Sequence, residues 1–102
     1  MILVIDTKDQ KQVSVTLKEG KKVLACLRGE NEYGSQALLL LIMKILKVTK
    51  LDFKDLTGIE VETGPGSFTG LRVGATVAQA LGFSLNIPVN GKIGKSIKLY
   101  YT

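Results

Sequence analysis

The chain has 102 residues, of which 45% are hydrophobic, and a formal net charge of +5, values that fit one small domain with a basic surface. It contains no histidine, which excludes histidine-containing catalytic triads and the HExxH zinc motif. The single cysteine, Cys26, excludes an internal disulfide; its apolar neighbours predict a buried, inert thiol, and we expect a reducing cytoplasm. The lysines are scattered, so a solvated surface is favoured over weak attraction to RNA.

The first third of the chain is predicted to form three strands. Residues 2–6 are apolar but lack a basic flank and run into Asp6, so they favour a strand over a signal peptide or a membrane span. Residues 12–18 alternate apolar and polar side chains, which is typical of a half-buried strand. A turn at Glu19 and Gly20 leads into a third strand at residues 22–28, and we expect the three to form an antiparallel meander.

The remaining residues are predicted to alternate between helices and strands. We expect a helix at residues 35–48 with Ser35 as its cap, a short helical turn at 51–56 ended by Gly58, and a strand at 58–62. A second helix is expected to begin at Thr69 and to stop near Gly82, followed by a fifth strand at 86–89. Residues 92–102 are a basic tail that adds an edge strand or hangs free. No repeat or linker divides residues 1–102, which form a single domain.

This order of elements, β-β-β-α-β-α-β, is that of a ribonuclease H-like α/β fold. The fold predicts a mixed five-stranded sheet with strand order three-two-one-four-five, in which strands one, four and five are parallel. Right-handed crossovers place both helices on the same face of such a sheet. The opposite face is then bare, and it is expected to be partly polar because Glu60 and Glu62 alternate with Ile59 and Val61.

A glycine-rich loop, GPGSFTGLRVG at residues 64–74, follows the predicted fourth strand at its carboxyl end. We expect it first to shape the turn, with Gly66 in a backbone conformation that residues with a Cβ avoid. The second interpretation is an anion site, in which Ser67 or Thr69 caps the helix, free N–H groups attract phosphate and Arg72 adds a bidentate contact. The residues of this second interpretation are Asp6, Thr7, Gly64, Gly66, Ser67, Thr69 and Arg72.

The two helices carry more small and apolar residues than one sheet face needs. Residues 37–43 are apolar around the whole helix, and small residues recur every four positions on the second helix, at 70, 74, 78 and 82. We expect two helices from each of two subunits to form a four-helix interface, and the alternative is that the small-residue stripe packs on its own sheet or on the first helix. Leu40 is the leucine least needed by the domain's own core. The predicted interface residues are Leu40, Leu41, Met43, Lys44, Gly70, Gly74 and Ala78.

The opening residues ILVIDT (2–7) and the glycine loop resemble the TsaB family, also called YeaZ, over about residues 1–91. TsaB is the bacterial partner of TsaD in making threonylcarbamoyladenosine in tRNA. The resemblance implies an actin-like ATPase fold and a non-catalytic, cytoplasmic scaffold that pairs through these helices with TsaD or with itself. A TsaE-like ATPase is a further implied partner, tRNA is contacted only indirectly, and no membrane is involved.

The family also implies what this chain lacks. Its members are about twice as long and carry a second, related half, so half of the cleft that would close over a nucleotide is missing here. Asp6 stands where nucleotide-using relatives of the fold hold a metal-linked carboxylate, yet we expect no cofactor or ATP hydrolysis for the isolated chain, and ATP or ADP only within a complex. The opening methionine and Glu60 and Glu62 favour a naturally short form. The alternatives are a self-associating module and a small phosphate-binding enzyme or peptidase.

Overall fold

The computed structural model describes residues 1–9, 11–30 and 35–100, apart from the side chain of residue 35. Three antiparallel strands come first: β1 (Ile2–Asp6), β2 (Gln12–Glu19) and β3 (Lys22–Glu30). Helix α1 (Ser35–Thr49), the short 3₁₀ helix η1 (Phe53–Asp55), β4 (Gly58–Val61) and α2 (Phe68–Leu85) follow. The predicted capping of α1 by the residue 35 side chain lies outside the described part.

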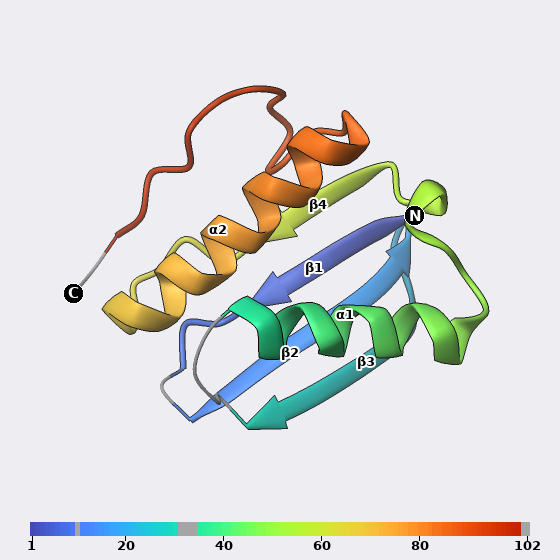
Figure 1. Ribbon diagram of the computed structural model, residues 1–102, viewed down its shortest axis with the longest axis horizontal. Coiled ribbons are helices and arrows are strands. Elements are labelled where there is room, and N and C mark those ends of the chain that lie inside the picture. The colour runs from blue at the N-terminus through green and yellow to red at the C-terminus, as the bar shows by residue number, and fades with distance from the viewer. Residues whose placement is uncertain (10, 31–34, 101–102) are drawn as a thin grey trace.

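The sheet has the order β3-β2-β1-β4, with β4 parallel to β1. Both helices cover the same face of this sheet (Figure 1). The predicted order of the first four strands and the shared helical face are thereby confirmed, as the right-handed crossover rule requires. Helix α2 continues three residues past Gly82, because its carboxyl end is set by Asn86, a left-handed residue whose N–H bonds the carbonyls of Gly82 and Phe83.

The predicted fifth strand at residues 86–89 is wrong, and the sheet has four strands. Only Val89 pairs with β4, in an isolated parallel bridge to Ile59. The segment is too short for a strand because Asn86 belongs to the end of α2, Pro88 has no N–H to donate, and a tight turn begins directly after Val89. The Asn90 side chain replaces the next peptide group of such a strand: its Oδ1 accepts from the Val61 N–H at 2.9 Å and its Nδ2 donates to the Val61 carbonyl at 3.2 Å.

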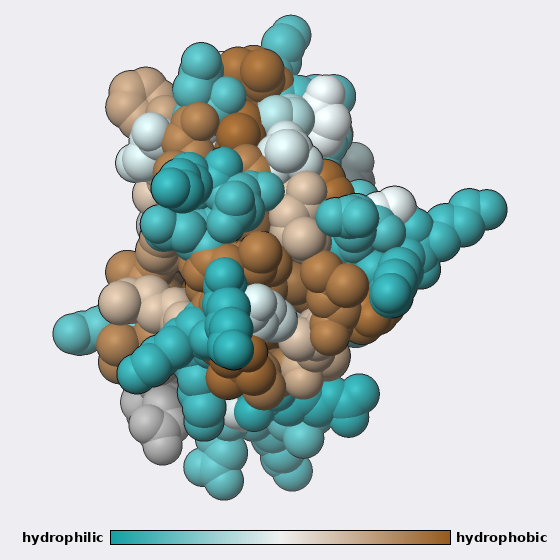
Figure 2. Space-filling view, turned by 90° about the vertical axis from the view of Figure 1, so that its right-hand side faces the viewer, coloured by the Kyte–Doolittle hydropathy of each residue, from teal (hydrophilic) through white to brown (hydrophobic). Residues whose placement is uncertain are grey.

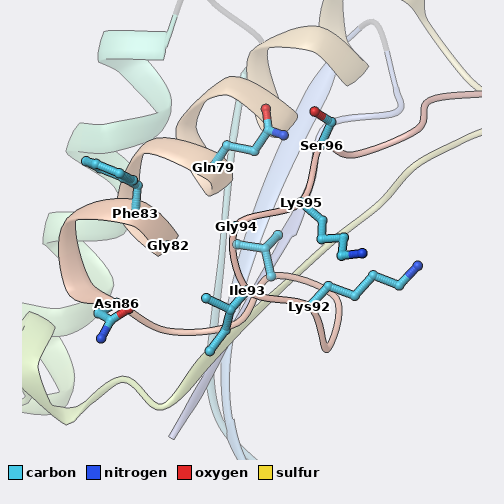
Figure 3. A pocket seen from close by; sticks show the side chains of 10 residues that line it. Gln79, Gly82, Phe83, Asn86, Lys92, Ile93, Gly94, Lys95 and Ser96 are labelled. Carbon is cyan, nitrogen blue, oxygen red and sulfur yellow. The ribbon is translucent and has the colours of Figure 1, made fainter.

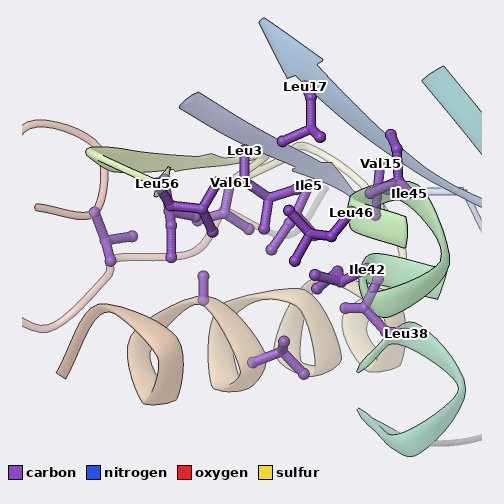
Figure 4. Packing of buried hydrophobic residues seen from close by; sticks show 14 residues of the cluster. Leu3, Ile5, Val15, Leu17, Leu38, Ile42, Ile45, Leu46, Leu56 and Val61 are labelled. Atoms are coloured by element: carbon purple, nitrogen blue, oxygen red, sulfur yellow. The ribbon is translucent and has the colours of Figure 1, made fainter. Parts of the chain in front are cut away.

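The core lies between the sheet and the two helices (Figure 4). Because side chains alternate along a strand, only every second residue of β1, β2 and β4 faces the helices. These residues pack against the inner side of α1, where the buried residues are three or four positions apart along the helix. The buried cluster includes Leu3, Ile5, Val15, Leu17, Ile59 and Val61 from the sheet and Leu38, Ile42, Ile45 and Leu46 from α1.

The opposite face of the sheet is uncovered in the described part of the chain and mixes apolar and charged groups, as expected. Lys18 and Glu60 form an ion pair of 2.9 Å there.

The prediction that Cys26 is buried is wrong: it lies exposed on the edge strand β3, within 3.4 Å of the Thr16 hydroxyl on β2. Seen from the end at which the N-terminus lies, apolar side chains show between polar ones (Figure 2). No helix among the described residues is long and apolar enough to cross a membrane.

Candidate functional site: the glycine loop and the outer helix face

The glycine loop joins the end of β4 to α2 and packs against the residues that follow β1. The Ser67 N–H donates to the Lys8 carbonyl at 2.9 Å, and the Gly64 N–H donates to the Glu62 carboxylate at 3.2 Å. Since β1 and β4 are parallel neighbours, their carboxyl ends bring these segments to one edge of the sheet. The predicted location of the loop at this edge is confirmed.

The reason for the glycine at position 66 differs from the predicted one. Its φ lies outside the left-handed region, so the residue is not in a conformation that excludes a side chain. A Cβ there would lie 2.7 Å from the Lys8 Cβ and 2.8 Å from the Lys8 carbonyl oxygen, which is too close. The unusual backbone conformation falls instead on Gly64, with φ at 111°. Gly66 is therefore required by close approach to Lys8.

The small-residue stripe of α2 faces the protein's own sheet, so the predicted interface role of Gly70, Gly74 and Ala78 is corrected. Thr7, fully buried, lies against the first two of these residues, and its hydroxyl donates a 2.6 Å hydrogen bond to the Gly70 carbonyl. A Cβ at Gly70 would collide with the Thr7 carbonyl oxygen and one at Gly74 with the Thr7 hydroxyl. Ala78 is fully buried in the core. Gly70 and Gly74 leave room for Thr7 at the end of β1, and Gly82 leaves room for Val89.

Ser67 caps α2, as the sequence allowed, by accepting a hydrogen bond from the Gly70 N–H at 3.3 Å. The N–H groups of Gly64, Ser67 and Gly70 are thus engaged within the protein. Arg72 points elsewhere: its guanidinium lies 5.3 Å from the centre of the Phe68 ring, and with Thr69 it lines a shallow hollow on the outside of α2. The structure does not bring Arg72 to the loop's inner side, and anion binding by this loop stays a prediction.

Charged groups surround Asp6 at the same edge of the sheet. The Asp6 carboxylate accepts from the Lys8 N–H at 3.1 Å, and the Lys8 ammonium lies 4.0 Å from Asp6 and 3.9 Å from Glu62. The Asp6 side chain thereby closes a local turn through Thr7 and Lys8. A cavity of about 270 Å³ adjoins these groups. Its lining residues are Asp6, Lys8, Asp9, Gln12, Val13, Ser14 and Arg28.

The outer face of α1 is apolar and exposed. Leu40 exposes 59% of its surface and Met43 49%, and Lys44 is exposed beside them. Leu40 is the most exposed leucine of this helix, which confirms that the core does not use it. Leu41 is half-buried against Gly29 of β3. Leu40, Leu41 and Lys44 together line a groove of about 490 Å³ between α1 and β3.

A second hollow of about 490 Å³ lies between α2 and the tail, and the sequence analysis missed it (Figure 3). It is lined by the carboxyl half of α2, including Phe83, and by residues 92–96. The tail reaches α2 because the chain reverses at Asn90 and Gly91, both with positive φ. An Asn-Gly pair is a strong sequence signal for a tight reversal, and it could have located this hollow.

Comparison with known proteins identifies the family of this chain. Residues 31–91 match the family model "TsaD: tRNA N6-adenosine threonylcarbamoyltransferase". The chain belongs to this family. Two relatives are named tRNA threonylcarbamoyladenosine biosynthesis protein TsaB. The protein from Buchnera aphidicola subsp. Schizaphis graminum is 34% identical over 89% of this chain and 43% of its own length. The protein from Bacillus subtilis is 32% identical over 87% of this chain and 39% of its own length.

A solved structure agrees with these relatives. YeaZ from Pseudomonas aeruginosa superposes with a TM-score of 0.76 at 28% identity, over 93% of this chain and 44% of that one. The resemblance to TsaB (YeaZ) and the expected actin-like α/β fold are thereby confirmed, with four strands in place of five. The chain spans less than half the length of these three TsaB-like proteins.

Proposed function

We propose that this TsaB-like chain is a non-catalytic partner subunit of the machinery that forms threonylcarbamoyladenosine in tRNA. The names of its relatives support the pathway, and the absence of histidine from the chain excludes a histidine base within it. The partner we propose is a TsaD-like catalytic subunit, with a TsaE-like ATPase as a further component, in the cytoplasm. ATP or ADP binds only within that complex.

The outer face of α1 carries the proposal. The core of this domain is covered by one layer of helices, and the outer side of that layer exposes Leu40, Met43 and Val48; Val48 exposes 61% of its surface. Large apolar side chains exposed on one helix are candidates for a protein–protein contact. Lys44 and Lys47 border it, so a partner with a carboxylate at the rim of an apolar patch would be complementary.

Self-association is the second candidate, and the same exposed apolar side chains of α1 favour it. Two copies could pack α1 against α1 around a two-fold axis, burying both apolar faces at once. The loop's engaged N–H groups favour neither a phosphate-binding enzyme nor a peptidase. We therefore rank partner binding first and self-association second.

Co-expression with the TsaD homologue of the same organism tests the proposal. We expect the two proteins to co-purify at a fixed ratio and the pair, with a TsaE homologue and ATP, to modify tRNA when either protein alone does not. Leu40→Glu on α1 should prevent this co-purification, and its control is Leu24→Glu, which places the same charge on an exposed leucine of β3. A chain that dimerises but never binds TsaD would support the second candidate and contradict the first.

A further inference from the structure

The tail of the chain, residues 92–100, is held in place at three points. A tight turn of type I′ character, with φ of 51° at Asn90 and 79° at Gly91, pairs Val89 with Lys92 through hydrogen bonds of 2.9 and 3.1 Å. Ile97 packs against the core, and the Tyr100 N–H donates to the Thr63 carbonyl at 2.8 Å. The described part of the tail thus forms neither the expected edge strand nor a free end, and its backbone runs beside α2 (Figure 1).

Three lysines of this segment line two adjoining cavities. Lys92 and Lys95 line both the hollow of about 490 Å³ and a smaller one of about 210 Å³, and Lys98 lines the smaller one. The side chains of Lys92 and Lys95 extend in the same direction, away from the Phe83 ring on the other side of the hollow (Figure 3). All three lysines are exposed, and none forms an ion pair within the part of the chain that the structure describes.

The rest of the lining suits a phosphate ester better than it suits a cation. Among the described residues that line the two cavities there is no aspartate or glutamate. Hydroxyl donors are present in the smaller cavity, from Thr63, Ser96 and Tyr100. Ammonium and hydroxyl groups together are the donors that proteins use for phosphate oxygens.

Exposed aromatic rings border the same surface. Phe83, in the wall of the larger cavity, exposes 90% of its surface, and Tyr100, in the wall of the smaller one, exposes 53%. The Lys98 ammonium lies 5.8 Å from the centre of the Tyr100 ring. Exposed rings on a surface that also carries lysines can stack bases, while the lysines contact the backbone.

We propose that Lys92, Lys95 and Lys98 form a binding surface for the phosphate backbone of single-stranded nucleic acid, with an unstacked base on Phe83. An acidic protein segment would also be attracted to the lysines, but its carboxylate side chains have no ring that could stack on the exposed Phe83. The proposal goes beyond the proposed function, because in it this chain binds nucleic acid directly and not only through a partner subunit. It concerns a segment outside the residues, 31–91, that match the family model.

The experiment uses the full chain and a fluorescein-labelled oligouridine of about 12 nucleotides, with binding followed by anisotropy from about 50 to 200 mM salt. The test variant carries Lys92→Gln, Lys95→Gln and Lys98→Gln. The control carries Lys21→Gln, Lys22→Gln and Lys54→Gln, which remove the same charge from exposed positions elsewhere. We expect the test variant to bind at least about tenfold more weakly at low salt, and its slope of log K against log salt to fall by about 2, since each single-strand phosphate contact contributes about 0.7.

Two further variants separate the contacts. Lys92→Arg, Lys95→Arg and Lys98→Arg together retain the charges and should retain binding, and circular dichroism of the glutamine variant controls for its folding. Phe83→Ala should weaken binding several-fold with an unchanged salt slope, because stacking releases no counterions. Equal losses in the two glutamine triples, no wild-type binding at low salt, or equal competition by a polyglutamate peptide would each overturn the proposal. All of these measurements use the isolated chain, so they are independent of whether it binds TsaD.

Discussion

The Thr7 hydroxyl donates a 2.6 Å hydrogen bond to the carbonyl of Gly70, 63 residues further along the chain. Thr7 is the residue that follows β1, and Gly70 lies in the first turn of α2. The contact ties the end of the central strand to the helix that the glycine loop begins. The absence of side chains at Gly70 and Gly74 is what leaves room for Thr7.

Replacing Thr7 with valine should destabilise the protein by about 1 to 3 kcal/mol, because a buried methyl group would then face a carbonyl oxygen that had a partner. The matched control is Thr16→Val on the open sheet face, whose hydroxyl makes only a 3.4 Å contact to the Cys26 sulfur and whose loss should change stability by less than about 0.5 kcal/mol. Urea unfolding measures both. Equal effects of the two substitutions would contradict the role assigned to Thr7.

Gly66→Ala should cost about 1 to 3 kcal/mol of stability, because the added Cβ meets the Lys8 backbone and cannot move away from it. Gly20→Asn is the contrasting control. Gly20 has a φ of 61° but open space around its Cβ position, and asparagine tolerates that conformation, so we expect a change below about 0.5 kcal/mol. Thermal melting distinguishes the two. If Gly66→Ala melts like the wild type, the packing of the loop on Lys8 is not as close as described.

Leu40→Glu should leave the fold intact and abolish association. The side chain is largely in water in the single chain, so a charge there costs little on folding, whereas in a helical interface it would be buried without a partner. We expect association with TsaD, or with a second copy, to weaken at least about a hundredfold, since an unpaired buried charge costs about 3 kcal/mol or more.

Sedimentation velocity reports the association of this variant, and circular dichroism controls for folding. Leu24→Glu, on β3, should associate like the wild type. Normal association of Leu40→Glu would remove the outer face of α1 from consideration as the interface.

Asn90→Ala should destabilise the protein by about 1 to 3 kcal/mol more than Asn86→Ala does. Both asparagines have a positive φ, 51° and 56°, so both substitutions introduce the same backbone strain. Only the Asn90 side chain bonds the N–H and the carbonyl of Val61, and its loss leaves the edge of β4 unsatisfied. Denaturant midpoints at matched slopes give the difference directly. A difference near zero would mean that water replaces the Asn90 amide at this edge without loss.

The isolated chain should show no ATP turnover above the buffer background. Asp6 is present at the edge of the sheet, where a nucleotide-bound metal would lie in related folds. However, several N–H groups of the glycine loop that could bind phosphate already form hydrogen bonds within the protein. A steady-state phosphate-release assay on pure protein measures this. Turnover that Asp6→Asn abolishes would contradict the prediction and would assign a nucleotide to the cavity beside Asp6.

Much of the fold could be predicted because it depends on local patterns and on one rule of handedness. The alternation of Val13, Val15 and Leu17 with polar residues specifies which side of β2 is buried, whatever lies beyond it. The connection of β1 to β4 through α1 then has one favoured hand, which places the helices on a shared face. The exposure of Leu40 followed likewise from its angle on α1, opposite the buried residues.

The sequence was less informative about the candidate sites, because their residues meet across long separations. A stripe of small residues indicates close packing but not the neighbour, and only the tertiary structure shows that Thr7, rather than another subunit, occupies the space at Gly70 and Gly74. The same holds for Gly66, whose constraint comes from Lys8 and not from its own φ.

The sequence by itself determined the periodic elements, the order of the first four strands and the faces that they bury, since these depend on residues a few positions apart. Only the tertiary structure decided where the sheet ends and what the tail does. The Asn90 side chain takes the place of a fifth strand at Val61, and the tail is held by Ile97 and by Tyr100 bonding to Thr63. Such contacts join groups 29 or more residues apart, and no local periodicity encodes which distant donor meets which acceptor.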